Sequence, residues 1–123
     1  MEHTITIDPQ RNLIVVSLRG EFEFADVKAA VEELMARPDY RASLNALYDL
    51  RGVTFGAVSS DALQKLSFEI ADPSWDGTRF ALVADDDDVF GICRIYCAVA
   101  SESGEQQRKA FRDFDSAEQW VLH

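Results

Sequence analysis

The spacing of hydrophobic residues along the chain predicts two strands first and a helix after them. Apolar and polar residues alternate over residues 3–7, and a β-branched run fills residues 13–18. Alternation of this kind is typical of strands that bury one face. Because the turn-forming residues 8–12 separate the two runs, the sequence predicts an antiparallel hairpin that ends at Gly20.

After Phe24 the hydrophobic period changes to the three- and four-residue spacing of an amphipathic helix. The apolar stripe consists of Val27, Ala30, Val31, Leu34 and Met35. Pro38 cannot continue a helix, so we expect the helix to end before it.

The remainder of the chain alternates between short apolar runs and helical stripes. Three more strands are predicted, at residues 44–50, 79–84 and 107–111. Three more helices are predicted: one marked by Leu63, Leu66 and Ile70, one from Val89 to Ala100, and a short last one that contains Trp120. Asp115 with Glu118 matches a capping box, which predicts that Asp115 is the N-cap of the last helix.

This element order, ββαβαβαβα, predicts an α/β fold. Neighbouring strands that are separated by a helix run parallel, because each helix returns the chain to its starting edge. We therefore expect a single domain over residues 1–123. It would hold a mixed five-stranded sheet, antiparallel only in the N-terminal hairpin, with about four helices covering its faces.

The charge of the chain narrows the classes of partner. Lys and Arg number 12 against 22 Asp and Glu residues, which gives a formal net charge of −10 spread along the chain. Such a field repels nucleic acid and anionic membranes, and it favours a basic or apolar partner.

No apolar run approaches the roughly 20 residues of a membrane-spanning helix. The N-terminus lacks the layout of a signal peptide, so we expect a cytoplasmic protein.

Cys93 and Cys97 are the only cysteines, and their spacing places both on one face of a helix. Two further ligands would be needed for a zinc signature. We therefore expect two small core residues in a reducing compartment. No metal or other cofactor is predicted.

Four short phrases of the sequence share their order and spacing with a known superfamily. They are residues 13–16 with Gly20, residues 49–55, Phe90-Gly91 with Arg94 and Tyr96, and residues 110–113 with Ala117 and Trp120. Together they resemble the SpoIIAA-like group of the STAS (anti-sigma-factor antagonist) superfamily over essentially the whole chain. The resemblance implies a non-enzymatic bacterial α/β module that binds a partner protein.

The resemblance also makes Ser59 and Ser60 candidate regulatory phosphosites. In the antagonists, a serine at the start of the helix after the third strand is phosphorylated, which breaks the partner complex. A helix N-terminus stabilises a phosphate through its free N–H groups and its partial positive charge. The other interpretation is that a serine, or Asp61, caps the helix with the same donors. Val58 and Asp61 replace the residues that flank the switch serine, so capping is favoured.

The loop before this helix, together with the helix start, is the expected contact surface. We assign to it Asp49, Arg51, Thr54, Phe55 and Asp61. Phe55 is a large apolar residue in a glycine-flanked loop, as contact residues often are. We expect another protein, or a second copy of the chain, to bind here.

A run of four acidic residues has two interpretations. It comprises Asp85, Asp86, Asp87 and Asp88. Carboxylates at the carboxyl end of a parallel strand can hold Mg²⁺ or Ca²⁺. Acidic residues that open a helix are also stabilised by its dipole, by about 0.3–1 kcal/mol each. Adjacent residues cannot all point at one ion, so capping is favoured.

Phe90, Arg94 and Tyr96 also allow two interpretations. As a phrase of the SpoIIAA-like group, they would line a small apolar pocket in which Arg94 holds an anionic head. Otherwise Tyr96 is core and Arg94 is solvated or ion-paired, which is the favoured interpretation.

Recognisable catalytic sets are absent from the sequence. His3 and His123 lie at opposite termini, and no phosphate loop, dinucleotide fingerprint or Gly-x-Ser-x-Gly motif occurs. We therefore predict a non-enzymatic regulatory or protein-interaction module. One alternative is a carrier or sensor of a small apolar or lipid-like ligand, for which eight Phe, three Tyr and two Trp residues argue. The other is the serine-phosphorylated switch.

Overall fold

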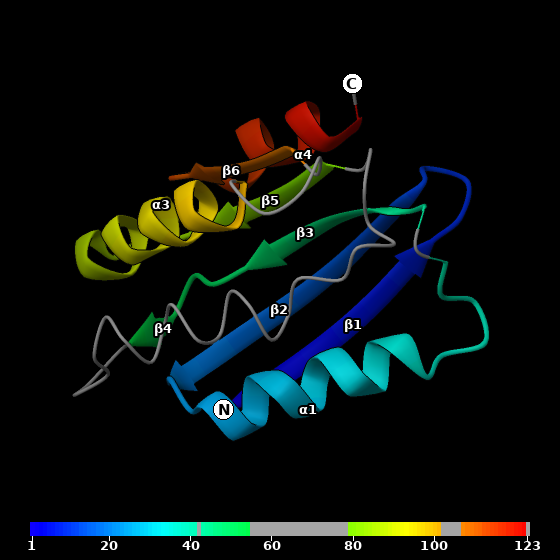
Figure 1. Ribbon diagram of the computed structural model, residues 1–123, viewed down its shortest axis with the longest axis horizontal. Helices are drawn as coiled ribbons and strands as arrows, with labels where there is room; N and C mark the ends of the chain where they lie inside the picture. Colours follow the sequence, from blue (N-terminus) through cyan, green and yellow to red (C-terminus); the bar gives the residue numbers. More distant parts are fainter. Residues whose placement is uncertain (42, 55–78, 102–106, 123) are drawn as a thin grey trace.

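The computed structural model describes residues 1–41, 43–54, 79–101 and 107–122. Within these residues the chain forms one sheet with helices on both faces (Figure 1). The strands are β1 (Glu2–Asp8), β2 (Leu13–Glu21), β3 (Asn45–Asp49), β4 (Val53–Thr54), β5 (Arg79–Val83) and β6 (Gln107–Phe111). The helices are α1 (Phe24–Met35), α3 (Asp87–Ser101) and α4 (Phe114–Leu122). The helix predicted from Leu63, Leu66 and Ile70 lies outside the described residues.

In the described part of the chain the sheet has six strands, five of which follow the order β1-β2-β3-β5-β6. β1 and β2 pair antiparallel in an unbroken register, from Glu2 opposite Arg19 to Asp8 opposite Leu13. β2, β3, β5 and β6 are parallel neighbours, so their carboxyl ends lie at the same edge of the sheet. We call this edge, where residues 17–19, 49–51, 83–88 and 111–115 lie, the carboxyl edge. The predicted α/β class, the hairpin and the parallel later strands are confirmed.

Two details of the predicted sheet are wrong. β2 does not end at Gly20 but continues to Glu21, and β4 is a sixth strand that the sequence did not indicate. β4 pairs parallel with Gly20 and Glu21 and is two residues long, too short to show a hydrophobic period. Gly20 and Gly52 have φ angles of +106° and +89°, which glycine adopts without steric cost and which direct the chain into this pairing.

Alternate residues of the strands enter two separate hydrophobic cores. On one face of the sheet, Ile14 and Val16 pack with side chains of α1 and α3. On the other face, Leu13 and Leu47 pack with Val121 of α4. Burying an aliphatic side chain of this size stabilises the fold by about 1.5–3 kcal/mol. The two-residue period of the strands therefore builds both layers. None of the helices in the described segments is long and apolar enough to cross a membrane.

Side chains from neighbouring strands hold the last turn of α4. Arg79 Nη1 donates a hydrogen bond to the Trp120 carbonyl at 2.6 Å, and Asn45 Nδ2 donates to the Val121 carbonyl at 2.7 Å. The last carbonyls of a helix have no partner within the helix, so these bonds fix α4 on the sheet. This docking places the first turn of α4 at the carboxyl edge.

The predicted N-cap of α4 is wrong. The helix begins at Phe114, and Asp113 caps it, because Asp113 Oδ2 accepts a hydrogen bond from the Ser116 N–H at 2.9 Å. This hydrogen bond lowers the pKa of Asp113. Asp115, the predicted cap, lies inside the first turn instead.

Candidate functional site

The carboxyl edge holds an ion pair between a buried aspartate and a half-exposed arginine at the end of β3. Among the described residues, Asp49 is the one charged residue that is buried, with 9% of its surface exposed. Arg51 Nε donates to Asp49 Oδ1 at 2.9 Å, and Nη2 donates to Oδ2 at 2.8 Å. A carboxylate in this position needs such a partner, because an unpaired buried charge is strongly destabilising. The same hydrogen bonds raise the pKa of Arg51.

The short turn after Asp49 brings Arg51 back onto it. The Arg51 N–H donates to Asp49 Oδ1 at 3.1 Å, and the Gly52 carbonyl accepts from the Gly20 N–H at 3.1 Å. The Arg51 guanidinium also lies 5.2 Å from the centre of the Phe114 ring on α4. Contacts from β2, β3 and α4 thus hold this arginine in place, while 48% of its side chain remains exposed.

A hollow of about 360 Å³ opens beside this ion pair. Its lining comes from the ends of β2 and β3 and from the segment after β5, and comprises Ser17, Leu18, Arg19, Asp49, Arg51 and Asp85. Ligand sites in open α/β sheets commonly lie outside the carboxyl ends of the strands, as this hollow does. Two guanidinium groups and two carboxylates line it, so it suits a surface or ligand that carries both signs of charge.

The four acidic residues after β5 lie at the same edge, and all of them are exposed. Asp86 is the N-cap of α3, because its Oδ1 accepts from the N–H groups of Asp88 at 2.9 Å and Val89 at 3.1 Å. Asp87 Oδ1 accepts from Arg112 Nη2 at 2.7 Å. The predicted capping role is therefore confirmed for Asp86. In residues 1–41, 43–54, 79–101 and 107–122, no group of three or more His, Cys, Asp or Glu side chains could hold a metal ion.

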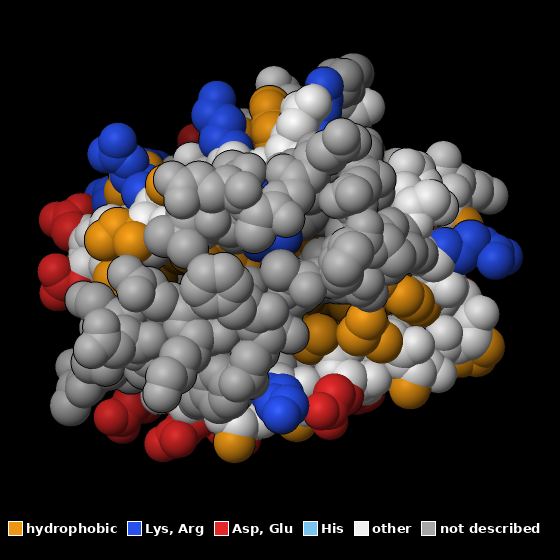
Figure 2. All heavy atoms as spheres, viewed as in Figure 1, with side chains coloured by type: hydrophobic (Ala, Val, Ile, Leu, Met, Phe, Trp, Pro, Cys, Tyr) orange, Lys and Arg blue, Asp and Glu red, His pale blue; other side chains and the backbone are white. Residues whose placement is uncertain are grey.

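The carboxyl edge as a whole is acidic. Three guanidinium groups, from Arg19, Arg51 and Arg112, face seven carboxylates, so the net charge of these residues is 3 − 7 = −4. The carboxylates belong to Asp49, Asp85, Asp86, Asp87, Asp88, Asp113 and Asp115. Figure 2 shows acidic side chains gathered at the end of the molecule where α3 begins, with Lys and Arg side chains beside them.

The structure places the three predicted pocket residues of α3 in different surroundings. Phe90 is half-buried, 4.9 Å from its ring centre to the guanidinium of Arg112. Arg94 is exposed. Tyr96 is buried, and its hydroxyl accepts a hydrogen bond from Arg108 Nη1 at 3.2 Å. The hollow beside Asp49 and the one beside β1 that described residues line do not include Phe90, Arg94 or Tyr96. A ligand pocket under α3 stays a prediction.

Cys93 and Cys97 are thiols buried on the inner face of α3. Burial raises the pKa of each thiol to about 12. A thiol that stays protonated near neutral pH is a poor nucleophile and a poor metal ligand. The prediction that both cysteines are core residues is confirmed.

Only part of the predicted contact surface can be placed. Asp49 and Arg51 form the ion pair, and Thr54 is exposed on β4, where its carbonyl accepts from the Phe22 N–H at 2.7 Å. Phe55 lies outside the described residues, as do Ser59, Ser60 and Asp61. The phosphosite and the competing cap therefore stay predictions from the sequence.

Sequence reasoning missed Ser17 and Arg19, which line the hollow. They interrupt the apolar run of β2 at alternate positions, so strand periodicity could have placed both on one face at the carboxyl edge. It also missed Arg108, whose guanidinium lies 5.5 Å from the ring centre of Phe80 and 5.6 Å from that of Tyr96. No sequence signal indicated this contact, because it joins residues from three separate elements.

Comparison with known proteins bears on the fold of the chain. No family model matches the chain, and no curated protein matches it. Among solved structures, the chain is similar to an uncharacterised protein of the DUF3478 family from Shewanella loihica PV-4 that has a SpoIIAA-like fold. The TM-score is 0.59 at 14% sequence identity, and the match covers 98% of this chain and 92% of that one. This chain has a SpoIIAA-like fold.

The SpoIIAA-like fold that the four sequence phrases predict is thus confirmed. A match at 14% identity concerns the course of the backbone and not individual side chains. What the SpoIIAA-like chain does at its carboxyl edge therefore has to be argued from its own ion pair, hollow and charge.

Proposed function

We propose that the chain is a non-enzymatic SpoIIAA-like regulatory module that binds another protein through its carboxyl edge. The observation that carries this proposal is the fixed position of Arg51. Its guanidinium is held by Asp49 and Phe114 but remains half exposed at the hollow. A side chain that is already ordered loses little entropy on binding, and arginine is enriched among residues that dominate binding energy.

The same geometry argues against catalysis at this edge. Both oxygens of Asp49 are engaged by Arg51, so this carboxylate is poorly placed to take a proton or a metal ion. Cys93 and Cys97 are buried and stay protonated near neutral pH. His3 Nε2 is hydrogen-bonded to Glu33 Oε2 of α1. Among the described residues, the groups best suited to acid–base or nucleophilic chemistry are therefore already engaged or buried.

The charge of the edge defines the chemistry of the proposed partner. The net charge of −4 at the carboxyl edge, within a chain of net charge −10, favours a partner that presents a basic surface. Exposed charges are screened by salt, so such a complex should weaken as the ionic strength rises.

Charge reversal at the carboxyl edge tests the proposal. Asp85 and Asp88 are exposed, and Asp86 supplies the cap of α3, so Asp85→Lys with Asp88→Lys should leave the fold intact. Glu32→Lys with Asp39→Lys makes the same change in charge at exposed positions in and after α1, and serves as the matched control.

We expect the tagged wild-type chain and the control variant to retain the same basic protein from a lysate of the source organism, and the edge variant to lose it. Retention by the edge variant at the wild-type level would contradict the proposal. So would equal loss by both variants, because the effect would then reflect total charge and not the surface.

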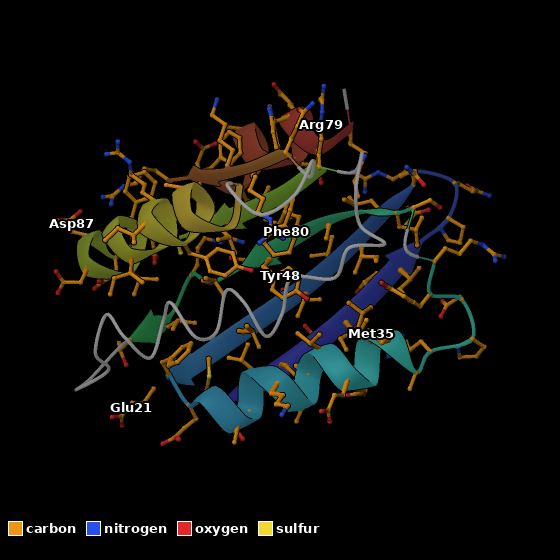
Figure 3. All side chains as sticks on the ribbon, in the orientation of Figure 1. Glu21, Met35, Tyr48, Arg79, Phe80 and Asp87 are labelled. Carbon is orange, nitrogen blue, oxygen red and sulfur yellow. The ribbon has the colours of Figure 1, made fainter. Side chains whose placement is uncertain are left out.

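One observation favours a second function, the carriage or sensing of a small apolar ligand. Tyr48 is buried near the centre of the sheet beside Phe80, with ring centroids 4.9 Å apart (Figure 3). Among the described residues, no group forms a hydrogen bond with its buried hydroxyl, and an unpaired buried hydroxyl typically costs about 1–3 kcal/mol. A bound molecule with one polar group would satisfy this hydroxyl.

Native mass spectrometry of gently purified protein tests this second function. A carrier should show a bound mass on the wild-type chain that is reduced in Tyr48→Phe, because the variant lacks the hydroxyl. A wild-type chain that shows only its own mass would contradict the carrier proposal. The serine switch at Ser59 and Ser60 is a minor alternative that phosphoproteomics of the source organism addresses directly.

A further inference from the structure

β1 lies at one end of the sheet and has an open backbone edge. Each residue from Glu2 to Asp8 pairs with β2 on one side. In an antiparallel pair, every second residue of an edge strand points its N–H and C=O groups away from its neighbour. Among the described residues, no backbone hydrogen bond uses these outward groups of residues 2–8. Within the described part of the chain, β1 therefore offers an unpaired edge to one more strand.

β1 lacks two of the features by which proteins usually block such an edge, a bulge and a proline. Its register with β2 is unbroken, so no bulge turns it away, and residues 2–8 contain no proline. Its centre, Thr4, Ile5 and Thr6, is uncharged and β-branched. The opposite edge strand differs, because β6 is shorter, carries Arg108 and Lys109, and packs against both α3 and α4.

We propose that two copies of the chain pair through β1, antiparallel, about a two-fold axis perpendicular to the sheet. The sheets of the two copies would then form one continuous sheet, and the outward backbone groups of both β1 strands would be satisfied. We assign the second strand to another copy of the chain because two β1 strands can pair in a register in which no like charges face each other. This inference does not rest on the proposed function, because it concerns a different surface from Asp85 and Asp88.

Three symmetric registers are centred on the uncharged middle of β1, at Thr4, Ile5 or Thr6, and charge and proline placement disfavour two of them. If Ile5 lay on the two-fold axis, Glu2 of each copy would face Asp8 of the other, and directly opposed like charges destabilise a sheet. If Thr6 lay on the axis, the turn that begins at Pro9 would be drawn into the ladder, and proline has no N–H to donate.

The remaining register places Thr4 on the two-fold axis. Thr4 of one copy then faces Thr4 of the other, and threonine pairs are favourable across strands. Glu2 faces Thr6, and His3 faces Ile5, so no like charges meet. Thr4 and Thr6 are both exposed, which leaves room for a neighbouring strand on this side of the sheet.

Single cysteine substitutions in β1 test whether two copies pair in this register or collide without a fixed one. Directly opposed residues of an antiparallel pair have Cα atoms about 4.5–5.5 Å apart, which suits a disulfide. In the proposed register, the two Thr6 residues are displaced by four positions along the strand, about 13 Å, which a disulfide cannot bridge. Cys93 and Cys97 are buried, so an added thiol at position 4 or 6 is the accessible one.

We expect Thr4→Cys to form a disulfide-linked dimer under mild oxidation of the purified full chain, and the matched variant Thr6→Cys to form little.

Equilibrium sedimentation of the wild-type chain should give the mass of a dimer. Thr4→Lys should raise the dissociation constant of the dimer about fivefold, because two ammonium groups then face each other. Salt should strengthen this dimer by screening the net charge of −10 on each copy, the opposite of its effect on a basic partner.

Three results would overturn the inference. One is equal disulfide formation by Thr4→Cys and Thr6→Cys, or preferential formation by the latter. Another is a wild-type chain that sediments as a monomer at high micromolar concentration. The third is a dimer whose dissociation constant Thr4→Lys leaves unchanged, since the contact would then lie elsewhere.

Discussion

Arg51 connects the parts of the carboxyl edge at the scale of single residues. It makes two parallel, charge-assisted hydrogen bonds to Asp49 and lies over the ring of Phe114, so it links β3 to α4. Such bonds are about twice as strong as those between neutral groups, and only a planar guanidinium makes both at once. Because Asp49 is nearly inaccessible to solvent, water replaces this partner poorly.

Removing the Arg51 guanidinium should therefore destabilise the fold. We expect Arg51→Ala to lower the free energy of unfolding by about 2 kcal/mol, because a buried carboxylate loses its charged donors. Arg51→Lys should recover only part of this loss. Arg94→Ala, at an exposed position of α3, is the control and should stay within about 0.5 kcal/mol of the wild type. Urea denaturation measures all three, and an Arg51→Ala effect no larger than the control would refute the role given to the pair.

The cap of α4 makes a prediction that depends on pH. Hydrogen bonds from Ser116 lower the pKa of Asp113, so the folded state is stabilised above the unfolded pKa of about 3.9 and loses this contribution as the pH falls through the lower folded pKa. We expect Asp113→Ala to lower the thermal midpoint at pH 7, and the difference from the wild type to shrink in acid. Asp115→Ala, which removes a carboxylate inside the first turn of α4 and not the cap, is the control variant. Equal midpoints for the two variants at pH 7 would show that Asp113 is not the cap.

At the scale of elements, the spacing of apolar residues predicted those strands and helices that extend over more than one repeat of that spacing. The alternation in β2 and the stripe of α1 each extend over several periods, so the sequence alone predicts both. β4 has two residues and no period to detect. The start of α4 was misassigned because Asp113 and Asp115 are equally good cap residues, and only backbone geometry selects one.

The candidate site was predictable to a lesser extent than the fold. Asp49 and Arg51 could be assigned to a contact surface, but their ion pair depends on a turn with Gly52 at positive φ. The hollow combines the ends of β2 and β3 with the segment after β5, and the order of these strands is a property of the folded chain. Arg108 lies against Phe80 and Tyr96 for the same reason.

The packing of α3 makes its two thiols a probe of this element. With pKa values raised to about 12, Cys93 and Cys97 should hold roughly one thiolate in ten thousand at pH 8, and burial also blocks access. We expect no reaction with a disulfide reagent in the native protein and two equivalents in denaturant. Stoichiometric labelling of the native protein would show that α3 leaves the sheet readily or packs differently.

At the scale of the whole molecule, net charge and the open edge of β1 imply two kinds of association. A chain of net charge −10 with an acidic carboxyl edge should bind a basic protein more weakly as salt increases. Pairing of two identical chains through β1 should respond in the opposite direction. Ionic strength therefore separates the two surfaces without any mutation.

The dissociation constant of the partner retained in the capture experiment tests the central claim most directly. It should be measured for the wild type, the edge variant Asp85→Lys with Asp88→Lys, and the control Glu32→Lys with Asp39→Lys, at low and at physiological salt. We predict that the wild type and the control bind alike and that salt weakens both. The edge variant should bind at least roughly tenfold more weakly. One dissociation constant shared by all three chains and insensitive to salt would contradict the claim that the carboxyl edge is the binding surface.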